Sequence, residues 1–150
     1  MRKYCFISSS GGHFEQLKML QPIMKRNSII ITEKVDGIEM KSENYYDLLQ
    51  VNRREILFII KIIRNTFKSL VIFIKEKPDI IICTGALSTI PFCIISKIFN
   101  SKLIYIESYA KVHMGSITGR LMYLIADKFY VQWDSMLKIY PNAIFKGGIY

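Results

Sequence analysis

The residues best suited to chemistry lie in a glycine-containing segment near the start of the chain. An apolar run at 4–7 leads into SSSGGH at 8–13, and a helical pattern follows at 13–26. The pKa of a histidine side chain lies near neutrality, so His13, at the mouth of this turn, is a candidate general base. The alternative is a histidine that binds a ligand or orders the loop without transferring a proton.

Glycines follow two of the predicted strands. Glycine-rich turns and helix starts present backbone N–H groups that favour phosphate and other anions. The candidate anion-binding residues come from both turns and are Ser10, Gly11, Gly12, Thr84, Gly85 and Ser88. Tight turn geometry is the simpler alternative. Neither turn contains Gly-Lys-Ser/Thr or fits G-x-G-x-x-G, so ATP and dinucleotide sites are disfavoured.

Glu107 ends the strand predicted at 102–107, at the sheet edge where ligands of open parallel sheets collect. It could accept hydrogen bonds from ligand hydroxyl groups, or act as the base in place of His13. It could instead pair with Arg120 or Lys111, or cap a loop. The sequence leaves these alternatives open.

Strand and helix patterns alternate along the whole chain. Continuous apolar or β-branched runs predict strands, and amphipathic segments predict helices. We expect strands at 3–9, 28–34, 45–51, 79–84, 102–107, 128–132 and 143–145, and helices at 13–26, 53–76, 89–99, 116–126 and 134–139. Residues 35–44 are expected to form a polar loop. This order predicts one Rossmann-like α/β domain over 1–150, with helices on both faces of a parallel sheet.

The long helix predicted at 53–76 is a second feature that could have a function. Its apolar stripe is expected to pack on the sheet and comprises Ile56, Ile59, Ile60, Ile63, Phe67, Leu70, Val71 and Ile74. Outside this stripe fall the apolar residues Phe58, Ile62, Ile72 and Phe73, and its flank carries Lys61, Arg64, Lys68 and Lys75. Apolar groups beside a basic edge suit an anionic membrane surface or a subunit interface. A core helix with a solvated basic edge is the alternative.

The candidate contacts with a membrane or a partner are Arg54, Phe58, Lys61, Arg64, Lys68 and Trp133. Trp133 is included because it follows a predicted strand end and because tryptophan is enriched at contact surfaces. Core packing would explain Trp133 equally well.

The overall charge points to an anionic partner. The chain carries 21 Lys and Arg against 12 Asp and Glu, a formal charge of +9. No nucleic-acid recognition motif accompanies this charge, so no nucleic-acid partner is expected. The scattered cysteines predict reduced core thiols and no metal site. The sequence contains no stretch of about 18 uncharged apolar residues, so no membrane-spanning helix is predicted.

Four motifs together resemble a known family. SSGGHF at 9–14 resembles the N-terminal loop of MurG-like GT-B glycosyltransferases, and TGALSTIPF at 84–92 is similar to their second glycine turn. The motifs YIES at 105–108 and VQW at 131–133, with Tyr140-Pro141 after them, narrow the resemblance. They are similar to bacterial polysaccharide-biosynthesis subunits that resemble the membrane-anchoring half of the dolichol-pathway N-acetylglucosamine transferase.

The resemblance implies a split GT-B enzyme. This chain would be the N-terminal-type, acceptor-binding half, and a separate donor-binding glycosyltransferase subunit would hold the UDP-sugar. The implied acceptor is a saccharide on a lipid pyrophosphate carrier, used in capsule or exopolysaccharide synthesis. The implied location is peripheral, at the cytoplasmic face of the cell membrane. The glycine turns would hold the carrier pyrophosphate, and His13 or Glu107 would be the base.

The family resemblance leaves one alternative open, a non-catalytic membrane scaffold that recruits and activates a competent partner transferase. No Asp-x-Asp pair is present, which suits a transferase that works without a metal. No cofactor is expected.

Overall fold

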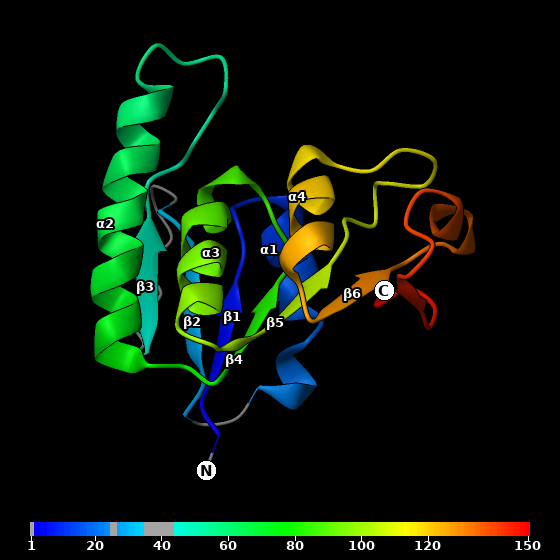
Figure 1. Ribbon diagram of the computed structural model, residues 1–150, viewed down its shortest axis with the longest axis horizontal. Helices are drawn as coiled ribbons and strands as arrows, with labels where there is room; N and C mark the ends of the chain where they lie inside the picture. The colour runs from blue at the N-terminus through cyan, green and yellow to red at the C-terminus, as the bar shows by residue number, and fades with distance from the viewer. Residues whose placement is uncertain (1, 25–26, 35–43) are drawn as a thin grey trace.

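The computed structural model describes residues 2–24, 27–34 and 44–150, so most of the loop expected at 35–44 lies outside the described residues. Seven parallel strands form one sheet in the order β3-β2-β1-β4-β5-β6-β7 (Figure 1). Their bounds are β1 Tyr4–Ile7, β2 Ile29–Glu33, β3 Tyr45–Leu48, β4 Ile80–Cys83, β5 Lys102–Ile106, β6 Lys128–Val131 and β7 Ile144–Phe145. Each predicted strand is present, shortened at its ends.

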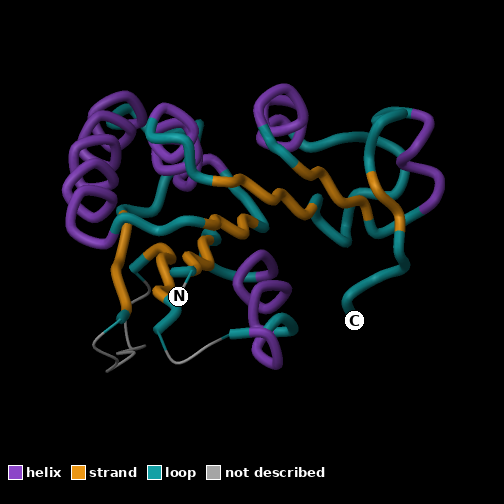
Figure 2. Tube along the Cα trace, turned by 60° about the horizontal axis from the view of Figure 1, so that its bottom comes forward, coloured by secondary structure: helices purple, strands orange, loops and turns teal. Residues whose placement is uncertain are grey.

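Helices cover both faces of the sheet, as predicted (Figure 2). One face carries α1 (Gly12–Lys18) and the 3-10 turn η1 (Gln21–Ile23). The other carries α2 (Phe58–Glu76), α3 (Ile90–Ile98) and α4 (Ile117–Ile125). Two further 3-10 turns are η2 (Leu87–Thr89), which leads into α3, and η3 (Asp134–Lys138), which follows β6.

The core consists of two apolar layers, one on each side of the central strands. Alternate residues of β1 divide between the layers, as the pleat requires. Cys5 and Ile7 pack with α2, α3 and α4, whereas Phe6 packs with Leu17 of α1. All three cysteines of the chain are free and buried. The sheet is therefore covered on both sides and holds the strand ends rigidly.

The carboxyl ends of the central strands meet at one edge of the sheet. Ile7 at the end of β1 pairs with Ile31 of β2 and with Cys83 of β4. The loops that follow β1, β4 and β5 therefore start side by side. This is the edge at which open parallel sheets bind ligands.

The expected packing of the long helix is wrong. The helix begins at Phe58 rather than at residue 53, and its buried residues are Asn65, Ser69, Ile72 and Phe73. The stripe predicted to pack on the sheet instead faces outward, except for half-buried Leu70. The buried face is specified by Asn65, whose side chain accepts a hydrogen bond from Leu49 N and donates one to Leu49 O, both at 2.8 Å. A buried amide with both groups satisfied fixes the helix orientation although the opposite face is more apolar.

Two absences apply to the described residues only. None of the helices there is both long enough and apolar enough to span a bilayer. No group of three or more His, Cys, Asp or Glu side chains in the same ranges could hold a metal ion.

Candidate functional site

His13 is held against the second glycine turn by two reciprocal hydrogen bonds. Its Nδ1 lies 2.7 Å from the carbonyl oxygen of Thr84, and the Thr84 hydroxyl donates to the His13 carbonyl oxygen at 2.9 Å. Because a carbonyl oxygen can only accept, Nδ1 must carry the proton in this contact. The lone pair of the neutral ring is then on Nε2. This is the tautomer that a general base requires.

Gly85 allows this close approach between the two turns. Its φ is +97°, and a Cβ at this position would lie 3.1 Å from Tyr105 Oη and 3.2 Å from His13 Cε1. Any larger residue would therefore be strained and would crowd the imidazole. Thr84 and Gly85, expected in the candidate binding set, thus position His13.

Gly11 and Gly12 lie beside His13 at the start of α1. A Cβ at either position would meet no atom within 4 Å, and Gly11 has a φ of +70°. The space above these glycines is open, so their backbone is accessible to a ligand.

Ser10 is hydrogen-bonded to a carboxylate that the sequence did not identify as part of the site. Glu33, at the end of β2, accepts hydrogen bonds from Ser10 N at 3.0 Å and from Ser10 Oγ at 2.6 Å. Its other oxygen accepts from Val51 N at 3.4 Å. Glu33 is only 4% exposed. It therefore ties the first glycine loop to the segment that leads into α2, and Ser10 N is not free for an anion.

Ser88 does not face a ligand. It is fully buried in η2, and its hydroxyl has no hydrogen-bond partner among the described residues. Its place in the candidate binding set is therefore not supported by the geometry.

Glu107 lies at the expected strand end, but its carboxylate is fully buried. It accepts hydrogen bonds from Ser108 N (2.9 Å), Ser116 N (3.1 Å), Ser116 Oγ (2.8 Å) and Tyr140 Oη (3.1 Å). Within the described chain it forms no ion pair, so the expected pairing with Arg120 or Lys111 is not seen. The geometry supports the alternative in which Glu107 caps a loop, because all its contacts are internal.

Three structural details explain why this loop is tightly closed. A Cβ at Gly119 would lie 1.9 Å from Glu107 Oε2, so only glycine fits at that turn of α4. Burial and the charge of Glu107 raise the pKa of Tyr140 above its ordinary value, which keeps its hydroxyl protonated as a donor. The carbonyl of Glu107 also accepts from the side-chain amides of Gln16 and Gln132, at 3.1 and 2.9 Å.

The contact residues proposed in and before the long helix have different environments. Arg54 and Arg64 are exposed, whereas Phe58 is half-buried. Lys61 pairs with Glu55 and Lys68 pairs with Asp47. The hydrogen bond from Lys68 is the largest cause that holds the pKa of Asp47 below its usual value.

Trp133 is not part of the α2 surface. It follows β6, its Nε1 donates to the carbonyl oxygen of Tyr109 at 2.7 Å, and the two rings lie 4.8 Å apart. The Tyr109 ring also meets Tyr150 at 4.8 Å. Trp133 therefore helps to hold the end of the chain near the loop after β5.

A family model described as "Oligosaccharide biosynthesis protein Alg14 like" matches residues 33–149. The chain belongs to the Alg14-like family. The predicted resemblance is thereby confirmed at the level of the family.

Members of the Alg14-like family match over different parts of this chain. The "UDP-N-acetylglucosamine transferase subunit ALG14" of Yarrowia lipolytica is 23% identical over 154 residues, covering 97% of this chain and 67% of the relative. The subunit of the same name from Homo sapiens is 30% identical over 81 residues, which cover 50% of this chain and 38% of the relative.

Solved structures confirm the fold of this Alg14-like chain. MurG of Acinetobacter baumannii aligns with a TM-score of 0.68 at 12% identity, covering 90% of this chain and 43% of MurG. UDP-N-acetylglucosamine 2-epimerase of Rickettsia bellii aligns with a TM-score of 0.73 at 14% identity, covering 99% of this chain and 45% of the epimerase. The chain corresponds to less than half of each protein, so the likeness shows a GT-B-type half with a Rossmann-like sheet.

Proposed function

We propose that this chain is the acceptor-binding, membrane-associating subunit of a two-component glycosyltransferase that uses a UDP-sugar. The family membership and the word "subunit" in the names of the relatives support this proposal. The observation that carries it is the His13 arrangement, an imidazole whose Nδ1 is bonded to Thr84 O, which leaves Nε2 available, beside two open glycines at the ligand-binding edge. The donor-binding half would be a separate protein that closes the cleft over this edge.

In this proposal the acceptor is a saccharide on a lipid pyrophosphate carrier. Its hydroxyl oxygen bonds to the anomeric carbon of the donor sugar as the bond from that carbon to UDP breaks, and UDP leaves with the electron pair. The hydroxyl proton moves to Nε2 of His13, while Nδ1–H stays bonded to Thr84 O. The backbone of Gly11 and Gly12 is open to the carrier pyrophosphate, and the positive charge of the chain favours such an anion.

Glu107 has a different role in the proposed enzyme. Because its carboxylate is enclosed by four donors, it holds the loop after β5 in place and does not take the proton. His13 is therefore the proposed base.

The proposed location is the cytoplasmic face of the cell membrane, where a lipid-linked acceptor is available, with peripheral attachment. The resemblance of its motifs to those of bacterial polysaccharide-biosynthesis subunits favours capsular or exopolysaccharide synthesis as the pathway class.

Sugar transfer from radiolabelled UDP-sugars to a lipid-linked acceptor in membranes tests this function. The assay compares this chain alone, a candidate donor-binding partner alone, and both together, with UDP-N-acetylglucosamine and UDP-galactose as donors. We expect transfer mainly with both chains, because half a cleft cannot hold both reactants. Strong transfer by this chain alone would contradict the split arrangement. If adding this chain to the partner did not increase transfer, this chain would have no part in the reaction.

A further inference from the structure

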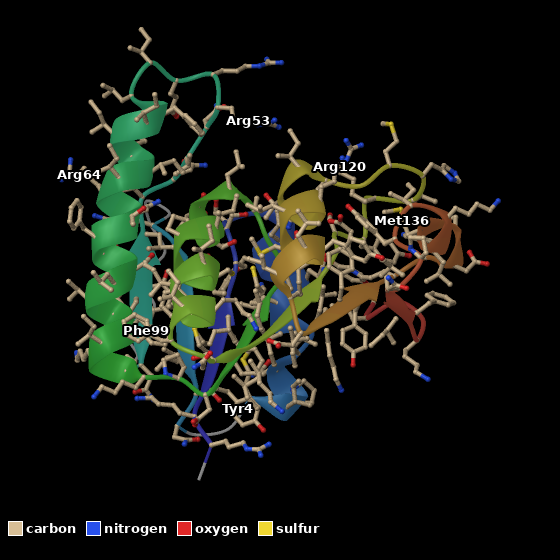
Figure 3. All side chains as sticks on the ribbon, viewed as in Figure 1. Tyr4, Arg53, Arg64, Phe99, Arg120 and Met136 are labelled. Atoms are coloured by element: carbon tan, nitrogen blue, oxygen red, sulfur yellow. The ribbon has the colours of Figure 1, made fainter. Side chains whose placement is uncertain are left out.

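Two buried glutamines meet at one backbone carbonyl group at the ligand-binding edge of the sheet. Gln16 of α1 and Gln132 after β6 are 1% and 4% exposed, and both side-chain amides donate to the carbonyl oxygen of Glu107. Other long polar side chains, such as Arg64 and Arg120, project outward from α2 and α4 (Figure 3). Burying an amide costs free energy unless its hydrogen bonds are made, so these bonds decide where the two glutamine side chains lie.

Both ends of the Gln16 amide are bonded to the loop that follows β5. Its Nε2 donates to Glu107 O at 3.1 Å, and its Oε1 accepts from Tyr109 N at 3.2 Å. Because a backbone carbonyl only accepts and a backbone N–H only donates, these contacts fix which way the amide is turned. Gln16 therefore ties α1 to this loop at two points.

The carbonyl group that Gln16 binds belongs to a residue that is held through all its polar groups. The Glu107 N–H donates to Tyr130 O at 2.9 Å, and the Glu107 carboxylate accepts four hydrogen bonds. Gln132 uses the second lone pair of the carbonyl oxygen, at 2.9 Å. A helix bonded to this carbonyl group is therefore bonded to a fixed point of the sheet edge.

The helix that carries Gln16 has little else to fix its orientation. α1 has seven residues, follows the two open glycines and has no side-chain cap among the described residues. Helices this short are stabilised by packing rather than by their own hydrogen bonds. Leu17 is fully buried against the sheet, but apolar contacts are not directional. The two hydrogen bonds of Gln16 supply the direction that this packing lacks.

Gln16 lies one turn after His13 in α1, on the same side of the helix. His13 contacts the turn after β4 through Thr84, and Gln16 contacts the loop after β5. Because β4 and β5 are paired, the two contacts hold α1 across neighbouring strand ends. Without the bonds of Gln16, α1 could turn about the contact between His13 and Thr84.

We propose that Gln16 is a positioning residue for His13 and sets the direction of the imidazole by locking α1 to the loop after β5. Because Gln16 is 1% exposed, it acts through α1 and touches no reactant. It keeps His13 Nδ1 on Thr84 O, so that Nε2 always faces the same place. The catalytic consequence rests on the proposed function, whereas the effect of Gln16 on the imidazole does not.

Gln16→Met and Gln132→Met form a matched pair of variants. Each replaces a buried amide by an apolar side chain of similar length, and each removes one donor to Glu107 O and one acceptor for a backbone N–H. The N–H bound by Gln132 is that of Ile149, at 3.1 Å, so its bonds do not involve α1. Urea unfolding should show a comparable loss of stability in both variants, but only Gln16→Met should change His13.

Long-range ¹H–¹⁵N NMR of the histidine side chains observes the imidazole directly in the 150-residue chain. The chain has two histidines, so His13→Ala assigns the His13 signals and His113 serves as the internal reference. With the ring neutral, wild type should show one His13 tautomer, protonated on Nδ1. In Gln16→Met the other tautomer should become detectable, and exchange of the Nδ1 proton with water should rise about tenfold, the factor for the loss of about one hydrogen bond. Gln132→Met should match wild type.

Turnover in the two-chain transfer assay gives an independent measurement. Gln16→Met is expected to lower kcat by about 10–100-fold with little change in KM for the UDP-sugar, because a small misplacement of a catalytic group costs about this much. Gln132→Met should stay within about twofold of wild type. A changed imidazole with unchanged turnover would support the positioning role and would contradict the role of His13 as base.

Gln16→Glu is the second variant, used if far-UV circular dichroism shows that Gln16→Met does not fold. It keeps an acceptor for Tyr109 N and loses the donor to Glu107 O, so it should change the His13 signals in the same direction. Wild-type His13 signals in a folded Gln16 variant would overturn the proposal. Equal changes of His13 in Gln16→Met and Gln132→Met would also overturn it, because they would show a general loosening of the loop.

Discussion

Replacing Glu107 should destabilise the fold strongly, because its carboxylate is the acceptor for four donors in a fully buried loop. A buried donor left without its acceptor costs about 1–3 kcal/mol, and such costs are not fully additive for neighbouring groups. Glu107→Ala also leaves a cavity. We therefore expect the free energy of unfolding to fall by at least about 3 kcal/mol, a large share of the stability of a typical domain.

Glu107→Gln is the matched variant, since it keeps the shape and removes the charge. One amide oxygen can still accept, but the NH₂ group would face donors where the carboxylate now accepts. We expect a smaller loss than for alanine, about 1–3 kcal/mol. The measurement is urea unfolding followed by far-UV circular dichroism, with the midpoint and the slope both reported.

The two possible roles of Glu107 give different results. A loop-capping role predicts that stability falls in both variants and that any loss of transfer follows the loss of folded protein. If Glu107→Gln unfolded within about 0.5 kcal/mol of wild type but had no transfer activity, Glu107 would act directly on the substrate and our reasoning would be refuted.

Three further variants test other parts of the structure. Gly85→Ala should lower the unfolding free energy by about 1–3 kcal/mol in urea melts, because its φ of +97° disfavours a side chain; unchanged stability would contradict that geometry. Asn65→Ala removes both bonds to Leu49 and should lower thermal stability by about 2 kcal/mol, whereas Thr66→Ala on an exposed position of α2 should have little effect. Asp47 has a lowered pKa, so its pair with Lys68 stabilises the fold above the unfolded-state pKa and loses this effect as the pH falls through the folded-state pKa. Acid titration of Asp47→Asn should therefore show a smaller loss of stability than wild type over that range, by less than about 1 kcal/mol because the pair is partly exposed; an identical acid limb would contradict this.

The sequence predicted the sheet well because its strands are buried on both faces. Runs such as 80–83 are continuously apolar and end at a glycine turn, which leaves little choice of structure. The two glycine turns and His13 were also predictable, since each follows a strand. Their meeting at one edge is a consequence of parallel topology.

The sequence could not predict which face of α2 is buried. A hydrophobic stripe normally marks the core side, but here the buried side is set by contacts of Asn65 with the end of β3, which are distant in sequence. Glu33 was missed for a similar reason, because its partners come from two different loops. An acidic residue at a strand end was the only signal available. The enclosure of Glu107 also depends on chain segments that meet only in the folded structure.

Replacing His13 with alanine in the reconstituted two-chain assay shows whether this chain supplies the base for sugar transfer. Turnover is measured with saturating UDP-sugar and lipid-linked acceptor, with vesicle binding and unfolding measured on the same preparation. We expect turnover to fall by about 10²–10⁴-fold, the usual contribution of a general base, while folding and membrane binding are kept. Turnover equal to that of wild type would show that His13 is not the base and would leave this chain as a scaffold for a competent partner.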